Sequence, residues 1–126
     1  GYALMKKGFY FIGINDTDCN GEKMFIPELQ EGSVEYYGKL YIHRHKDYEG
    51  NPNKWRLSHV NTGAAVLVDI DLASARMLAK LLQPFTLWEI KTHDEIQQVI
   101  AEGTRNPEAP YHEELKEIRK IRYMRA

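Results

Sequence analysis

The sequence is short of cysteine, of net charge and of long apolar runs, and each shortage excludes a class of protein. Cys19 is the single cysteine in 126 residues, so a disulfide framework within one chain and a zinc site with two or more thiolates are both excluded. Apolar runs stay well below the roughly 18 residues that a membrane-spanning helix needs, and no signal peptide is readable at the start. We therefore expect a soluble, cytoplasmic protein without a membrane partner.

The chain also lacks an excess of positive or of negative charge. The 17 lysine and arginine residues nearly balance the 18 aspartate and glutamate residues, which leaves a net charge of -1. Nucleic-acid-binding domains are usually strongly basic, so the total argues against that class. The charges are nonetheless grouped, since residues 36–60 carry five cations and two carboxylates whereas residues 1–35 carry three cations and six carboxylates.

The chain has no proline-rich linker, internal repeat or low-complexity tract, so residues 1–126 are predicted to form one domain. Hydrophobic residues make up 43% of it, which is enough for a packed core. Met5, followed by two lysines, has the pattern of a natural start. Residues 1–4 are therefore expected to be an addition without functional weight.

The first half of the chain has the pattern of β-strands. Residues 8–15 are aromatic and β-branched, a turn-rich segment follows, and residues 23–26 are apolar again before Pro27, which predicts a hairpin. A longer strand is predicted over residues 34–46. Its alternation directs Leu40 and Ile42 to the core. The opposite, solvent-facing side is expected to carry Tyr37, Lys39, Tyr41, His43 and His45.

Two further strands, 55–60 and 64–70, are predicted on either side of a tight turn at residues 61–63. A helix over residues 72–83 follows, with Asp71 as its N-cap. Residues 85–90 are predicted to form another short strand.

The last third of the chain predicts two more helices. Thr92 begins one of them with a capping-box spacing, and Gly103 is expected as its C-terminal left-handed residue. Another follows Pro110, with carboxylates early and cations late, as the helix dipole favours. Strands first and helices last predict an α+β fold, in which an antiparallel sheet of about five strands is covered by two or three C-terminal helices.

The basic block over residues 36–59 interleaves cations with aromatic residues. That combination is typical of single-stranded nucleic-acid binding, because cations neutralise phosphates while flat rings stack on bases. An ordinary sheet is the alternative, since tyrosine and tryptophan are common in strands and lysine protects edges. The residues expected to bind nucleic acid or a partner are Tyr37, Lys39, Tyr41, Arg44, Lys46, Trp55 and Arg56.

The second hypothesis is a protein-interaction or regulatory module, which could be a homodimer. In that case the same tyrosines and Trp55 would be interface anchors, and the charge blocks would provide complementarity. The stretch Trp55-x-x-Ser58-His59-Val60-x-Thr62-Gly63 is similar to small proteins of phages and mobile elements. The resemblance covers nine residues and implies no activity.

A third hypothesis is a metal-dependent enzyme. His43 and His45 share a strand face and His59 lies on a nearby strand, so the three could hold a metal with Glu49 as acid or base. The spacing Gly38-x4-His43-x-His45-x3-Glu49 resembles a first cupin motif shortened by one residue, but no second motif is present and the helical half leaves too few strands for that barrel. The alternative is two surface histidines on a polar strand.

The segment Asp16-x-Asp18-x-Asn20-Gly21 resembles the opening half of a calcium loop. The closing carboxylate falls one residue late and the flanks look like strands, so a polar hairpin turn is the main interpretation and a divalent-cation site the alternative. No other cofactor is expected.

Catalysis has little support in the sequence. Ser58 and His59 are neighbours in a predicted strand, so they point to opposite faces and cannot pair as nucleophile and base. Cys19 lies in an acidic loop, which disfavours a thiolate. Nucleotide-binding, metalloprotease and hydrolase motifs are absent from the sequence, so no catalytic residue is predicted.

Overall fold

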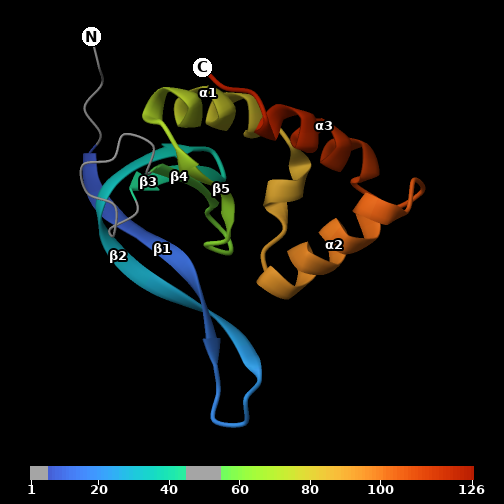
Figure 1. Cartoon of the computed structure of the whole chain (residues 1–126), viewed down its shortest axis with the longest axis horizontal. Coiled ribbons are helices and arrows are strands. Elements are labelled where there is room, and N and C mark those ends of the chain that lie inside the picture. Colours follow the sequence, from blue (N-terminus) through green and yellow to red (C-terminus); the bar gives the residue numbers. More distant parts are fainter. Residues whose placement is uncertain (1–5, 45–54) are drawn as a thin grey trace.

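The computed structural model describes residues 6–44 and 55–126, which form a five-stranded sheet followed by helices (Figure 1). The predicted α+β class, with an antiparallel sheet ahead of C-terminal helices, is confirmed. The strands are β1 (Lys6–Thr17), β2 (Lys23–Tyr37), β3 (Leu40–Arg44), β4 (Trp55–His59) and β5 (Ala65–Ile70). The helices are α1 (Leu72–Leu82), the 3-10 helix η1 (Thr86–Glu89), α2 (His93–Arg105) and α3 (His112–Arg122).

Each strand pairs antiparallel with the next, in the order β1-β2-β3-β4-β5. The single strand predicted over residues 34–46 is wrong, because the chain reverses at Gly38 and Lys39 and Tyr37 pairs with Leu40. Gly38 has a φ of 56°, a left-handed conformation that glycine adopts without strain, and this is what allows the tight turn.

The N-caps of α1 and α2 are the residues that the sequence predicts. The Asp71 carboxylate accepts the Ser74 N–H at 3.0 Å, and the Thr92 hydroxyl accepts the Glu95 N–H at 3.2 Å. Gly103, in contrast, does not end its helix, because α2 continues to Arg105 and buries Gly103 against α3. A Cβ there would lie 2.5 Å from Leu115 Cδ1, so the glycine permits the close approach of the two helices.

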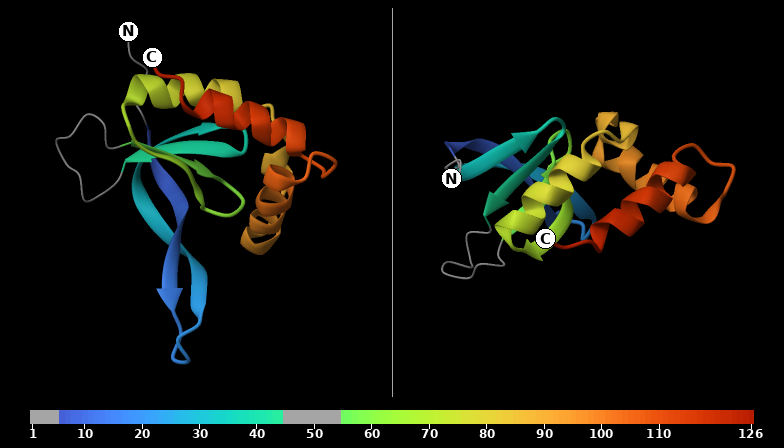
Figure 2. Two further views of the ribbon diagram at one scale, coloured as in Figure 1. Left: turned by 45° about the vertical axis from the view of Figure 1, so that its right-hand side comes forward. Right: turned by 90° about the horizontal axis from the view of Figure 1, so that it is seen from above.

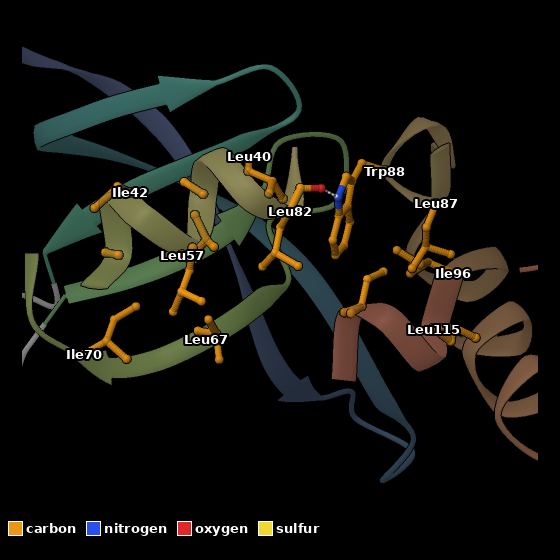
Figure 3. Packing of buried hydrophobic residues seen from close by; sticks show 14 of the residues in the cluster. Leu40, Ile42, Leu57, Leu67, Ile70, Leu82, Leu87, Trp88, Ile96 and Leu115 are labelled. Atoms are coloured by element: carbon orange, nitrogen blue, oxygen red, sulfur yellow. Dashed lines mark hydrogen bonds between the residues drawn. The ribbon is translucent and has the colours of Figure 1, made fainter. Parts of the chain in front are cut away.

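The predicted strand over residues 85–90 is also wrong, since this segment forms η1. Trp88 is nearly fully buried, and its indole N–H donates to the Leu82 carbonyl at the end of α1 (Figure 3). The apolar residues of this segment contact both the helices and the sheet. A short apolar run in a sequence does not distinguish such a buried helical turn from a buried strand.

The main core lies between one face of β3, β4 and β5 and the helices (Figure 3). Leu40, Ile42 and Leu57 are completely buried there, as the alternation predicts for the first two. Figures 1 and 2 show α1 over this part of the sheet, and α3 extends beyond it, packed against α1 and α2. Burial of these large apolar side chains, at about 1.5–3 kcal/mol each, is the main stabilising contribution.

The predicted first hairpin is confirmed but is longer than expected, since β2 continues through Pro27 to the tight turn. We call residues 8–33 the arm. Figure 1 and the left view of Figure 2 show its tip projecting away from β3–β5 and from the helices. Pro27 is tolerated because its partner Gly13 directs its N–H away from β2, to the Gly63 carbonyl, so this pair exchanges no ladder hydrogen bond.

The outward side of β1 is closed by contacts with the rest of the sheet. Besides the Gly13 N–H bond of 2.9 Å to Gly63, the Tyr36 hydroxyl donates to the Phe9 carbonyl at 2.9 Å, and the Tyr41 hydroxyl donates to the Phe11 carbonyl. The sheet therefore curls, and β1 covers the face of β3 that is opposite the helices.

Candidate functional site

The curl of the sheet buries the side of β3 that the sequence predicts as solvent-facing. Tyr41 is 1% exposed and His43 is 3% exposed, both packed with Tyr10 of β1. The expectation of an open aromatic face is therefore wrong for these two residues. Burial raises the pKa of the Tyr41 hydroxyl, as expected for a phenol without water around it. Tyr37 is half-buried, and its hydroxyl donates to Glu35 at 2.8 Å.

The remaining residues of the basic block that the structure describes do not gather on one exposed face. The exposed Arg44 places its guanidinium carbon 5.8 Å from the ring centroid of Trp55, which is half-buried against the main core. Arg56 pairs with His43, so it lies on the opposite face from Arg44. Lys39 occupies the turn between β2 and β3, and Lys46 lies outside the described residues.

Of the three histidines proposed as metal ligands, the two that the structure describes, His43 and His59, are not brought together. His43 lies on the Tyr41 face, whereas His59 pairs with Leu40 and faces the main core. His45 and Glu49 are outside the described residues. Within residues 6–44 and 55–126, no group of three or more histidine, cysteine, aspartate or glutamate side chains could hold a metal ion. His43 and His59 therefore cannot share one site.

Sequence reasoning missed a contact between His43 and Ser58, whose Nε2 and Oγ atoms are 2.8 Å apart. A serine within reach of an imidazole has the geometry of a nucleophile and its base. Both side chains are at most 3% exposed, however, so a substrate has no access to them. The pair is a satisfied polar contact inside the second, smaller core cluster. Ser58 and His59 do point to opposite faces.

Replacing Tyr41 by phenylalanine should lower the free energy of unfolding by about 1–2 kcal/mol, because the Phe11 carbonyl loses the hydrogen bond that it accepts from this almost fully buried tyrosine. Urea denaturation would measure the change. Tyr36→Phe is the matched control, since it removes the equivalent bond to Phe9 from a tyrosine that is half exposed, and it should cost less than about 0.5 kcal/mol. Equal decreases in the free energy of unfolding for the two variants would show that the burial of Tyr41 adds nothing to the strength of its hydrogen bond.

The loop at the arm tip uses its polar side chains to build the turn. The Asp18 carboxylate accepts the N–H groups of Asn20 and Glu22, and the Asp16 carboxylate accepts the Thr17 N–H. Gly21 has a φ of 81°, as a tight turn requires. These contacts support the hairpin-turn interpretation of the segment.

Exposed apolar side chains are concentrated on the arm, which the sequence did not reveal. Phe9, Phe11 and Leu29 share one face and are 63%, 53% and 55% exposed. Met24 and Ile26, on the other face, are 45% and 38% exposed. The only sequence signal is that the hairpin is apolar at successive positions, which a one-sided strand would not be.

A cavity of about 370 Å³ lies where the arm meets the rest of the protein. The Phe25 ring stacks on the His93 ring of α2 at 3.6 Å between centroids, with an angle of 10° between the planes. A Cβ at Gly13 would lie 1.7 Å from Cζ of the Phe25 ring, so this glycine leaves room for the end of the ring against β1. The cavity is lined by Phe11, Phe25, Pro27, Val60, Asn61, Thr62, Gly63 and His93.

Comparison with known protein families, with curated proteins and with solved structures found no match. In the part of the chain that the structure describes, none of the helices has the length and apolar character needed to cross a membrane.

Proposed function

We propose that this protein is a non-enzymatic interaction module that binds a partner protein through the arm. The observation that carries the proposal is the row of three large apolar side chains, Phe9, Phe11 and Leu29, each more than half exposed on one face. Folded monomers rarely leave large contiguous apolar patches in water, and such patches commonly mark interaction sites. Aromatic residues are also the usual anchors of protein interfaces.

Single-stranded nucleic acid is supported less well. Burial of Tyr41 removes one of the rings expected to stack on bases, and the cations Arg44 and Arg56 lie on opposite faces of the sheet. The net charge of -1 provides little attraction for a phosphate backbone. Nucleic-acid binding by this block stays a prediction. An anisotropy titration with a labelled oligonucleotide at low salt would support it if binding were detected and weakened as salt rises.

The proposal is tested by photo-cross-linking in an extract of the source cells. p-Benzoylphenylalanine replaces Phe9 or Phe11 in the full chain, and the same residue at Gln98, exposed on α2, is the matched control. We expect one partner to be cross-linked from both arm positions and not from position 98. The adduct should disappear when Leu29→Lys is added.

Leu29→Lys should leave the free energy of unfolding within about 0.5 kcal/mol of the parent, because the side chain is already 55% exposed. Thermal unfolding would measure this. If cross-linking from the arm were no stronger than from position 98, or if Leu29→Lys unfolded the protein, the arm would be a structural element rather than an interface.

A further inference from the structure

Among residues 6–44 and 55–126, no strand covers the outer edge of β2 along residues 27–33. In the described part of the chain, these residues pair with β1 and with no other strand. β3 pairs with β2 only along residues Val34 to Tyr37 of β2. Alternate residues of an antiparallel strand direct their N–H and C=O groups to opposite sides. The Gly13 N–H points away from β2, so its partner Pro27, and likewise Leu29 and Glu31, direct their backbone groups away from β1.

The two edges of the arm thus differ. β1 is closed by Tyr36, Tyr41 and Gly63, while the open edge of β2 presents the N–H groups of Leu29 and Glu31 in line with β3. Unpaired edges of this kind are templates for strand addition by another chain. The apolar row of Phe9, Phe11 and Leu29 lies on one face of the same two strands.

The charge of this edge is uniformly negative. Glu28 and Glu31 are both exposed, one on each face of β2, and residues 27–33 contain no cation. The arm as a whole has five carboxylates and one cation, Lys23. Opposite charges on neighbouring strands stabilise a pair, and like charges destabilise it. A strand added at this edge is therefore favoured when its side chains are basic.

We propose that the arm takes up an extended, lysine- or arginine-containing segment of its partner protein, which adds as a strand to residues 27–33 of β2. This inference rests on the proposed function and specifies its partner. Main-chain hydrogen bonds to Leu29 and Glu31 supply the pairing. The segment's cations meet Glu28 and Glu31, and its apolar residues extend the row formed by Phe9, Phe11 and Leu29.

A second copy of this chain fits the edge less well. Pairing of two β2 strands around a twofold axis would place Glu28 and Glu31 of both chains at one seam, where like charges repel. Pro27 would also leave a gap in the ladder on each side, because it has no N–H to donate. A nucleic acid is disfavoured by the same carboxylates.

The test uses fluorescence anisotropy with the full chain and short labelled peptides as probes. The first probe is the seven-residue peptide Lys-Lys-Val-Val-Lys-Lys-Val, which as a strand places lysine and valine on both faces and so can meet Glu28 and Glu31, and its matched control has glutamate in place of every lysine. We expect the lysine peptide to bind more tightly, by about fivefold for each charge pair formed. Backbone amide NMR shifts should change along residues 28–33 of β2. Equal binding of both peptides would overturn the charge argument.

Two N-methylated lysine peptides test the strand geometry without changing the protein. Each carries methyl groups on one of the two alternating sets of backbone N–H groups, and only one set can face β2. One methylated peptide should lose binding and the other should retain it. Loss of binding in both, or in neither, would overturn strand addition.

The charge-reversal variant Glu28→Lys/Glu31→Lys should weaken the lysine peptide at least tenfold and strengthen the glutamate peptide. Glu108→Lys, at an exposed carboxylate in the loop before α3, is the matched control and should change neither. If Glu108→Lys weakened binding of the lysine peptide by the same factor for each charge reversed, the effect would come from the net charge of the protein, and the edge of β2 would not be the binding site.

The outcomes separate this inference from the proposed function. Cross-links from positions 9 and 11 without binding of the lysine peptide would overturn the basic strand and leave the arm as an interface. Loss of both would overturn the two together. Sedimentation equilibrium should show a monomer. If it instead showed a dimer that Leu29→Lys dissociates, the occupant of the edge would be a second copy of this chain, and the proposal of a basic partner segment would be overturned.

Discussion

Gly63→Ala is expected to lower the free energy of unfolding by about 3 kcal/mol. Gly63 has a φ of 72°, which costs an L-residue about 1–2 kcal/mol. An added Cβ would also lie 2.8 Å from the Gly13 nitrogen and 3.0 Å from the Ile12 carbonyl carbon. These are backbone atoms, so they cannot move aside as a flexible side chain can. The strain falls on the hydrogen bond that holds β1 against the turn.

Gly21→Ala is the matched control for this effect. Gly21 has a similar φ of 81°, but an added Cβ would meet nothing within 4 Å. Its expected cost is therefore the conformational part alone, about 1 kcal/mol. Urea denaturation of both variants measures the difference. Equal losses would show that the contact between the turn and β1 contributes nothing beyond backbone conformation.

His59 should make the free energy of unfolding fall as the pH is lowered below about 6.5. The ring is 1% exposed, with Nε2 2.6 Å from the Trp88 carbonyl and Nδ1 2.8 Å from the Thr62 hydroxyl. Burial lowers the pKa of this histidine in the folded protein. Between the lowered pKa and 6.5, only the unfolded chain takes up the proton, so acid favours unfolding, by up to about 1.4 kcal/mol per pH unit.

His59→Leu should remove this pH dependence between pH 7.5 and 5.5. It should also cost about 2 kcal/mol at pH 7.5, because Thr62 and the Trp88 carbonyl lose a partner. Chemical denaturation at several pH values gives both quantities. The control is His93→Leu, which leaves His59 in place and should retain the slope. A slope that survived in His59→Leu would assign the pH dependence to another group.

The elements that the sequence predicted well are those determined by local chemistry. Asp71 and Thr92 cap their helices because a side-chain oxygen and a backbone N–H three residues later are enough. The turn at Gly63 was expected for a similar local reason. Errors arose where a local pattern had two solutions. Gly38 reversed the chain inside a predicted strand, and the apolar residues around Trp88 formed a 3-10 helix.

The candidate site was mostly beyond reach of sequence reasoning, because it depends on the curl of the sheet. Alternation correctly separated Leu40 and Ile42 from Tyr41 and His43. It could not show that β1 would return to cover the second face, since the covering contact joins Tyr41 to the backbone of Phe11. Once that face is covered, the exposed apolar residues are those of the arm.

The closure of β1 also bears on how the chain folds during synthesis. The first strand emerges from the ribosome long before Gly63, whose carbonyl anchors Gly13, and before Tyr41, whose hydroxyl caps Phe11. Until these residues emerge, the nascent hairpin exposes both of its edges, and such unpaired edges are where early aggregation begins. Translation past the second half of the sheet is therefore the step that leaves a single edge of the arm accessible.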